Sequence, residues 1–219
     1  MGVKRLILKN KTLILYLLVS SFVFRSIENN KSFIMKNLYF ILSVCLLILA
    51  NSVYSQTLEI YGVTKQGGTH DAGVIYKTDT DGNYQEVVHS FEKIQGSRPW
   101  HTQLCEADNG RLYGLTYEGG LYNQGTLFEY NPEDNTFVSK VDFQSPGPYG
   151  ADPAGSLVKA TNGKLYGMTS YGGNSGSGVI FEYDPFNNSI RKRIDFENEI
   201  GGGWPYGDLI QATNGKFYG

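Results

Sequence analysis

Few residue patterns in this chain suggest reactive chemistry. The stretch 79–83 (Asp-Thr-Asp-Gly-Asn) resembles the opening of a calcium loop, in which alternating acidic residues before a glycine present hard oxygen ligands. The glutamate that such a loop needs six residues after the glycine is replaced by Val88. The corresponding stretches 131–135 and 184–188 lack the acidic spacing. We therefore interpret 79–83 as a turn between two strands, and we predict no metal site and no bound cofactor.

Catalytic motifs are equally weak. The three histidines, His70, His89 and His101, share neither a repeat position nor the spacing of metal ligands. No Gly-x-Ser-x-Gly motif stands out in the strand-to-helix context that exposes a serine nucleophile. The sequence therefore predicts no catalytic residues and a protein that is not an enzyme.

Three loops are better candidates for a functional site. Each begins with a Gly-Gly pair and ends at a third glycine, and they span 67–73, 119–125 and 172–178. Their sequences vary between the fixed glycines, as expected of binding loops on one rim of a rigid scaffold. Tyrosines in and beside them could serve as platforms for sugar rings. The predicted binding residues are His70, Asp71, Tyr117, Tyr122, Asn123, Tyr171 and Asn174.

These loops recur because the chain is built from repeats. The phrase Tyr-Gly-x-Thr-x-x-Gly-Gly occupies 61–68, 113–120 and 166–173, and a fourth Tyr-Gly pair ends the chain. The glycines of these four pairs, at 62, 114, 167 and 219, lie 52, 53 and 52 residues apart. A fixed period of about this length indicates a repeat architecture. Because the tyrosine recurs at one strand position, we expect it to pack between neighbouring units.

Each unit divides into four short strands. In the third unit they are predicted at Ser156–Thr161, Lys164–Ser170, Gly178–Asp184 and Ser189–Phe196. Asn162-Gly163 predicts a hairpin turn with positive φ at both central residues. The last strand alternates with period 2, with Ile194 on one face and Arg193 on the other.

Four antiparallel strands in roughly 50 residues is the size of a β-propeller blade. The predicted fold is therefore all-β, an incomplete propeller-like array of such blades. The repeats are assigned to 56–102 (lacking a first strand), 103–155, 156–207 and 208–219 (truncated). Because the chain stops within a strand, we expect a piece of a longer protein, with open blade edges that allow self-association.

The N-terminus has the pattern of an export signal. Residues 35–55 combine a short basic start, an apolar run and small residues before Gln56, as a secretory signal peptide does. Residues 1–34 are then an upstream extension outside the fold. The predicted location is secreted or cell-surface, with only transient membrane contact through the signal. Removal of the signal leaves Cys105 as the only cysteine.

Charge excludes one class of partner. From Gln56 onward, 12 Lys and Arg residues face 20 Asp and Glu residues, a balance of −8. Nucleic-acid binding needs a concentrated basic surface, so no nucleic-acid partner is expected. The single basic run, Arg191-Lys192-Arg193, is interpreted as a solvated strand edge.

The repeat also resembles a known family. Residues 157–173 (Leu-Val-Lys-Ala-Thr-Asn-Gly-Lys-Leu-Tyr-Gly-Met-Thr-Ser-Tyr-Gly-Gly), followed by Gly-Val-Ile-Phe at 178–181, resemble the GloVer-type tandem repeat of bacterial secreted proteins. The resemblance covers about 57–219. It implies a propeller-like extracellular module and supplies no catalytic residues.

Binding of an extracellular glycan or another surface polymer is the function we expect. One alternative is part of a propeller-based glycan lyase or hydrolase whose active site lies outside this chain. Another is a rigid spacer. A binding protein migrates more slowly in a gel that contains the polysaccharide and leaves the polymer unchanged. An enzyme releases reducing ends from the polymer, and a spacer does neither.

Overall fold

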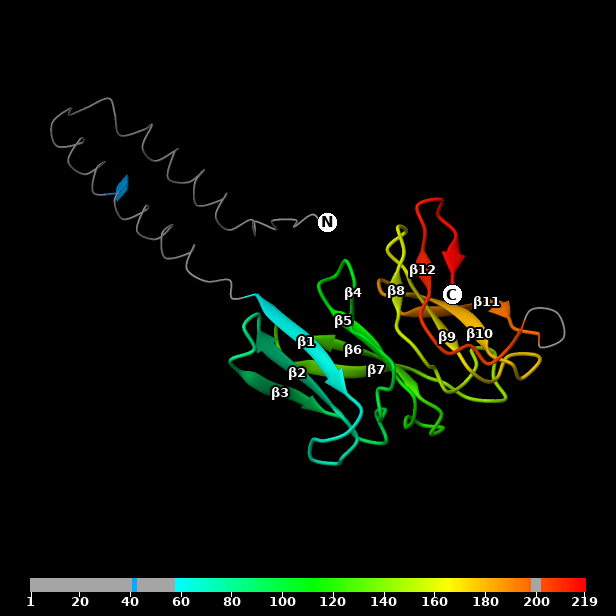
Figure 1. Cartoon of the computed structure of the whole chain (residues 1–219), viewed down its shortest axis with the longest axis horizontal. Coiled ribbons are helices and arrows are strands. Elements are labelled where there is room, and N and C mark those ends of the chain that lie inside the picture. The colour runs from blue at the N-terminus through cyan, green and yellow to red at the C-terminus, as the bar shows by residue number, and fades with distance from the viewer. Residues whose placement is uncertain (1–40, 43–57, 198–201) are drawn as a thin grey trace, which may run out of the picture. The chain divides into compact units, whose positions relative to one another are not determined.

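The computed structural model describes residues 41–42, 58–197 and 202–219 (Figure 1). The chain divides into two compact units, Met1–Thr57 and Leu58–Gly219. The predicted extension and signal peptide (1–34 and 35–55) lie outside the described residues, apart from helical Ile41 and Leu42. Within the described part of the chain, no helix is long and apolar enough to cross a membrane.

The region Leu58–Gly219, which holds all of the repeats, is built from antiparallel sheets whose strands follow one another in chain order (Figure 1). The first sheet contains β1 (Glu59–Thr64), β2 (Val74–Asp79) and β3 (Gln85–Ser90). The second contains β4 (Cys105–Glu106), β5 (Leu112–Thr116), β6 (Thr126–Asn131) and β7 (Thr136–Asp142). The third contains β8 (Val158–Lys159), β9 (Leu165–Thr169), β10 (Val179–Asp184) and β11 (Ser189–Asp195), and β12 (Ile210–Gln211) pairs with β13 (Phe217–Tyr218). This confirms the all-β, propeller-like array of four-stranded antiparallel sheets.

The Asn-Gly turn that opens each unit differs from the prediction. Gly163 has φ +77°, but Asn162 is not among the residues with positive φ. The Ala160 carbonyl accepts the amide of Gly163 at 2.9 Å, and the Asn162 side-chain oxygen accepts the amide of Lys164 at 3.0 Å. The predicted turn with two positive φ angles is wrong, because the asparagine side chain closes a three-residue loop in which only the glycine is left-handed.

A β-bulge interrupts each sheet at the same place. The register shifts between Ile75 and Tyr76 in β2, and at the equivalent positions of β6 and β10. In β11 the extra residue is Arg193, because Ile180 pairs with Ile194 and Phe181 pairs with Lys192. The simple alternation predicted for β11 is therefore wrong past the bulge, where Ile194 is 51% exposed.

The core lies between successive sheets. One cluster of buried residues joins the second and third sheets, and it includes Tyr113, Leu127 and Tyr183. Tyr113 and Tyr183 are fully buried, with ring centroids 5.9 Å apart. A second cluster joins the first and second sheets, and a third joins the third sheet to Leu209. The expectation that the recurring tyrosine packs between units is confirmed.

The glycine after that tyrosine is required by packing. A Cβ atom at Gly114 would lie 2.4 Å from the ring of Phe128, and one at Gly167 would lie 2.6 Å from the ring of Phe181. Both phenylalanines are fully buried and face these glycines across the sheet. The Tyr-Gly pair thus places a tyrosine in one interface and leaves room for an aromatic ring from the adjacent strand.

Candidate functional site

The Gly-Gly loops are held by a side chain from the end of the fourth strand of the same unit. Asp142 Oδ1 accepts the amide of Leu121 at 2.8 Å, and Asp195 Oδ1 accepts the amide of Asn174 at 2.9 Å. In the first unit, Ser90 Oγ accepts the amide of Thr69 at 3.5 Å. The loops are therefore fixed at their bases, which suits a rim that presents side chains to solvent.

Several predicted binding residues shape their own loops. Asp71 has φ +51° and accepts the amide of Gly67 at 3.0 Å, and Asn123 has φ +55°. Asn174 Oδ1 accepts a hydrogen bond from Lys192 Nζ at 3.1 Å. His70 lies 3.2 Å from the hydroxyl group of Thr69. These side chains stabilise separate loops, and no contact between the loops joins them within the described structure.

Two of the predicted tyrosines do come together. Burial, the Asp152 carboxylate and Tyr206 raise the pKa of Tyr117 to about 12. A side-chain hydrogen bond and charge interaction with Tyr206 raise the pKa of Tyr171. Tyr206 thus links the tyrosines that precede two successive Gly-Gly loops. Tyr122, in contrast, lies in a loop and is 49% exposed.

Trp100 extends this group of aromatic side chains. Its ring meets that of Tyr117 edge to face, with centroids 5.2 Å apart, and lies 4.8 Å from the ring of His101. The Nζ atom of Lys65 lies 4.3 Å from the centroid of the Trp100 ring, a cation–π contact. We call Trp100, Tyr117, Tyr171 and Tyr206 the aromatic row.

A cleft of about 480 Å³ adjoins the row. Its lining comes from three segments that hold the same place in three successive units, just before β4, β8 and β12. We call it the inter-repeat cleft, and it is lined by His101, Thr102, Gln103, Ala154, Ser156, Tyr206, Gly207 and Asp208. Its volume lies in the range typical of small-ligand sites. Tyr206 belongs to both the cleft and the aromatic row.

Hydrogen bonds between units hold the cleft together. The amide of Gln103 donates to Ser156 Oγ at 3.0 Å, and the amide of Ser156 donates to the Asp208 carboxylate. Further along, the amide of Thr161 donates to Gln211 Oε1 at 2.9 Å. Side chains of the third and fourth repeats therefore accept backbone amides of the repeat before them, so the shape of the cleft depends on how the repeats dock.

The serine of the cleft is not hydrogen-bonded to the histidine of the cleft. His101, Ser156 and Asp208 all line it, but Ser156 Oγ and the Asp208 carboxylate are both engaged by backbone amides. Among the hydrogen bonds of the described residues, none connects His101 with Ser156. An activated serine needs a base within hydrogen-bond reach, and this arrangement does not provide one.

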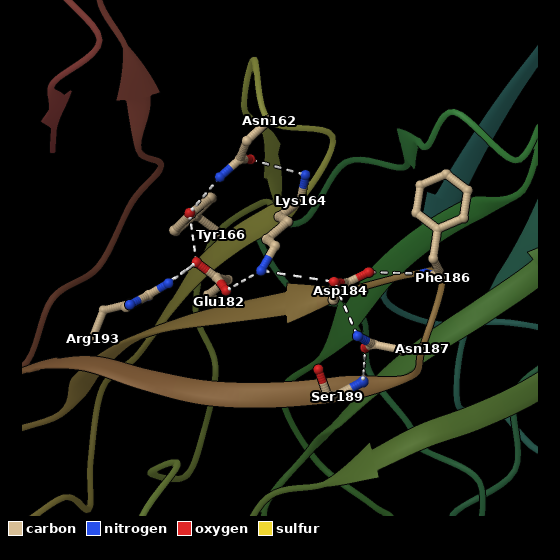
Figure 2. A network of polar contacts seen from close by, with 9 residues as sticks. All are labelled: Asn162, Lys164, Tyr166, Glu182, Asp184, Phe186, Asn187, Ser189 and Arg193. Atoms are coloured by element: carbon tan, nitrogen blue, oxygen red, sulfur yellow. Dashed lines mark hydrogen bonds and ion pairs between the residues drawn. The ribbon is translucent and has the colours of Figure 1, made fainter.

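A second polar cluster surrounds the buried carboxylate of Glu182 (Figure 2). Tyr166 donates to Glu182 Oε2 at 2.6 Å, Lys164 Nζ donates to Oε1 at 2.8 Å, and Arg193 donates through two nitrogens. Burial alone would raise the pKa of Glu182, but these hydrogen bonds outweigh it and lower the pKa to about 2. Asn162 in turn donates to the hydroxyl of Tyr166 at 3.0 Å.

The same cluster recurs in the second unit, where Tyr113 donates to buried Glu129 at 2.5 Å. Lys140 approaches Glu129 to 3.3 Å from the bulge position that Arg193 holds in the third unit. The basic run lies on the edge strand β11 with Arg191 and Arg193 exposed, as predicted, and Arg193 in addition pairs with a buried carboxylate. Recurrence at one structural position indicates that the cluster stabilises each sheet.

The first unit reverses the charges of this cluster. Lys77 faces Tyr61 across the sheet, as Glu129 and Glu182 face their tyrosines. Lys77 Nζ lies 3.1 Å from Glu59 and 3.4 Å from Glu86. In the first repeat a lysine lies between two carboxylates, whereas in the later repeats a carboxylate lies between two cations. The signs of the charges are exchanged, but opposite charges still face each other at the same strand positions.

The topology defines a propeller-like repeat protein. The family model of the Gloeobacter/Verrucomicrobia repeat matches residues 50–219, and the chain belongs to this family. No curated protein sequence matches the chain.

Two solved structures show a weak similarity. TolB from Acinetobacter baumannii is 15% identical, with a TM-score of 0.38, over 61% of this chain and 30% of that one. A puromycin-hydrolyzing peptidase of Mycobacterium tuberculosis is 15% identical, with a TM-score of 0.36, over 61% of this chain and 20% of that one. This chain therefore spans less than a third of either structure.

Sequence reasoning missed part of the site, namely Trp100, His101, Tyr206 and Asp208. One signal was present: an aromatic residue follows the proline that opens a unit in both Pro99-Trp100 and Pro205-Tyr206. The strand assignments gave no reason to place these residues beside the tyrosines of the Gly-Gly loops, because the contacts form between units.

Proposed function

We propose that this chain is an exported, non-catalytic module that binds a saccharide polymer through the aromatic row. The observation that carries the proposal is a group of aromatic side chains beside a cleft of about 480 Å³. The rings of Trp100 and Tyr117 lie 5.2 Å apart, and Tyr206, which lines the cleft, interacts with Tyr117 and Tyr171. Aromatic faces with adjacent polar groups suit sugar rings, which present apolar C–H surfaces and hydroxyl groups. Tyr171 is 40% exposed and Tyr206 58%, which leaves ring surface for a ligand.

Affinity electrophoresis of the full 219-residue chain in gels that contain a polysaccharide tests this function. We expect retardation in at least one gel and no release of reducing ends from the polymer. Release of reducing ends would support the lyase or hydrolase alternative. Absence of both effects across neutral, anionic and cationic polysaccharides would contradict the proposal and support the spacer interpretation.

Export is tested separately. The signal-like segment predicts that the chain is found outside the cytoplasm with Gln56 as its first residue. N-terminal sequencing of the chain from culture medium and cell-surface fractions measures this. A chain retained in the cytoplasm with residues 35–55 intact would contradict export without bearing on saccharide binding.

A further inference from the structure

The charges around the inter-repeat cleft restrict its ligand. Among the residues that line it, Asp208 carries the one carboxylate, and the other polar groups are hydroxyl, amide and imidazole. Asp152, beside the aromatic row, adds a second carboxylate, and burial and Glu118 raise its pKa. A polyanion would therefore approach carboxylates, whereas sugar hydroxyl groups can donate to them.

The cations near the row already have partners. Lys65 lies over the ring of Trp100, and Arg98 Nη1 lies 2.8 Å from Glu118 Oε1. Neither is available to neutralise an incoming anion without losing its present contact. The overall balance of −8 from Gln56 onward adds long-range repulsion of polyanions.

The backbones of two neighbouring segments meet beside Tyr206. Gly155 has φ +124°, and a Cβ atom placed there would lie 1.9 Å from the carbonyl oxygen of Gly207. Two units therefore meet backbone to backbone next to the cleft, and no side chain can grow from Gly155 into this space. Tyr206 follows in sequence the proline before this contact, lines the cleft and interacts with Tyr117 and Tyr171 of the row.

We infer that the inter-repeat cleft seats a stretch of an uncharged, hydroxyl-rich sugar chain, which stacks on Tyr206 and donates hydroxyl hydrogen bonds to Asp208. The bound sugar polymer continues from the cleft along the aromatic row toward Tyr171 and Tyr117. This inference rests on the proposed function and adds its ligand class and its binding position. Because the ligand contacts three units, it also stabilises their docking, and the melting temperature rises with ligand concentration.

Titration calorimetry and thermal unfolding of the full chain test this inference, with a soluble β-glucan, a mannan, a polyuronate and chitosan as probes. We expect a neutral polysaccharide to bind most tightly and to raise the melting temperature. Tyr206→Ala should weaken this binding about tenfold or more, since truncation of a stacked aromatic side chain commonly costs over 1.4 kcal/mol. Tyr206→Phe keeps the ring and should retain most of the affinity.

Two further variants isolate charge and position. Asp208→Asn keeps an oxygen that can accept the amide of Ser156 but removes the negative charge. It should weaken binding of the neutral polymer severalfold. Tyr84→Ala is the matched control, because Tyr84 is an exposed tyrosine between β2 and β3 that neither lines the cleft nor belongs to a Gly-Gly loop. Its affinity should equal that of the unmodified chain.

The outcomes separate the two proposals. Tightest binding of the polyuronate or of chitosan overturns the ligand class, while binding as such still supports the proposed function. Loss of affinity in a Tyr122→Ala variant, but not in Tyr206→Ala, overturns the position and moves the site to a Gly-Gly loop. No binding of any probe by a chain that unfolds cooperatively overturns both proposals.

Discussion

At the scale of single residues, the most constrained group is the Glu182 carboxylate. It is 2% exposed and accepts hydrogen bonds from Lys164, Tyr166 and Arg193. We expect Glu182→Gln to lower the free energy of unfolding by about 1–3 kcal/mol, because an uncharged amide cannot accept the same charge-assisted bonds. Chemical denaturation measures this loss, and Glu106→Gln, at an exposed position on β4, is the control.

Glu182 also makes the free energy of unfolding depend on pH. The pKa of Glu182 is about 2 in the folded chain, below its ordinary value of 4.5. The stabilisation is therefore complete above pH 4.5 and is lost as the pH falls from 4.5 toward 2. The difference in stability between the unmodified chain and Glu182→Gln should narrow over this interval, and a constant difference would contradict the assignment.

His89 also makes stability fall at acid pH, because folding favours its neutral form. Its ring stacks on that of Phe137 with centroids 4.0 Å apart, and its Nε2 atom is buried without a hydrogen-bond partner. Burial lowers the pKa of His89 from its usual 6.5, while the Glu92 carboxylate acts weakly against this effect. The unfolded chain thus takes up a proton at a higher pH than the folded chain, and stability falls as the pH drops below 6.5.

His89→Phe should remove this acid sensitivity, because phenylalanine keeps the stacking on Phe137 and does not titrate. Melting temperatures of both chains between pH 8 and pH 5 provide the measurement. The unmodified chain should lose stability relative to His89→Phe as the pH falls through this range. Parallel curves would show that the pKa of His89 is the same in the folded and the unfolded chain.

At the scale of strands and turns, the Tyr-Gly pair makes a specific packing demand. Gly114→Ala places a methyl group against the ring of Phe128 and should destabilise the fold by about 1–3 kcal/mol. Phe128→Leu should reduce the cost of Gly114→Ala, because leucine lacks the ring atoms that the methyl group meets. A double-mutant cycle by chemical denaturation measures this coupling.

Gly110→Ala is the control for that cycle. Gly110 has φ +74° in its Asn-Gly turn, and a Cβ atom there would meet nothing within 4 Å. Its substitution costs backbone strain alone, so Phe128→Leu should leave that cost unchanged. Equal coupling in both pairs would contradict the packing explanation.

How far the sequence predicts this structure depends on whether a feature is local. The strands of the third unit and the packing role of the recurring tyrosine follow from alternation and period, which act within one unit. The bulge that brings Arg193 to Glu182 does not, because an extra residue shifts the pairing without disturbing the hydrophobic pattern. The turn geometry at Asn162 was missed because two turn types share the same residue pair.

The candidate site was harder to predict for the same reason. Tyr117 and Tyr171 were found because they lie beside the repeated loops, but their partner Tyr206 lies at the junction between the third and fourth repeats. The cleft is lined by three segments that are each about 52 residues apart. Only the docking of the units brings them together, and no local pattern encodes that docking.

At the scale of the whole region Leu58–Gly219, stability is distributed over the interfaces between sheets. In repeat architectures each unit contacts chiefly its neighbours, so stability is close to a sum of unit and interface contributions. The cluster between the second and third sheets has the most buried residues of the three clusters. We expect amide hydrogen exchange to be slowest in β5, β6, β9 and β10, which flank this cluster.

A cavity in that central cluster should therefore act on two sheets at once. Leu127 lies on β6, is fully buried and contributes to the cluster shared with Leu165 and Phe181 of the third sheet. Leu127→Ala should cost about 2–5 kcal/mol and speed exchange in both β5–β6 and β9–β10. Leu209→Ala, in the cluster next to β12, should speed exchange mainly in the third sheet and in β12–β13. Hydrogen exchange resolved by peptide distinguishes the two patterns. If both variants speed amide exchange equally in all sheets of Leu58–Gly219, the sheets unfold together in one cooperative transition.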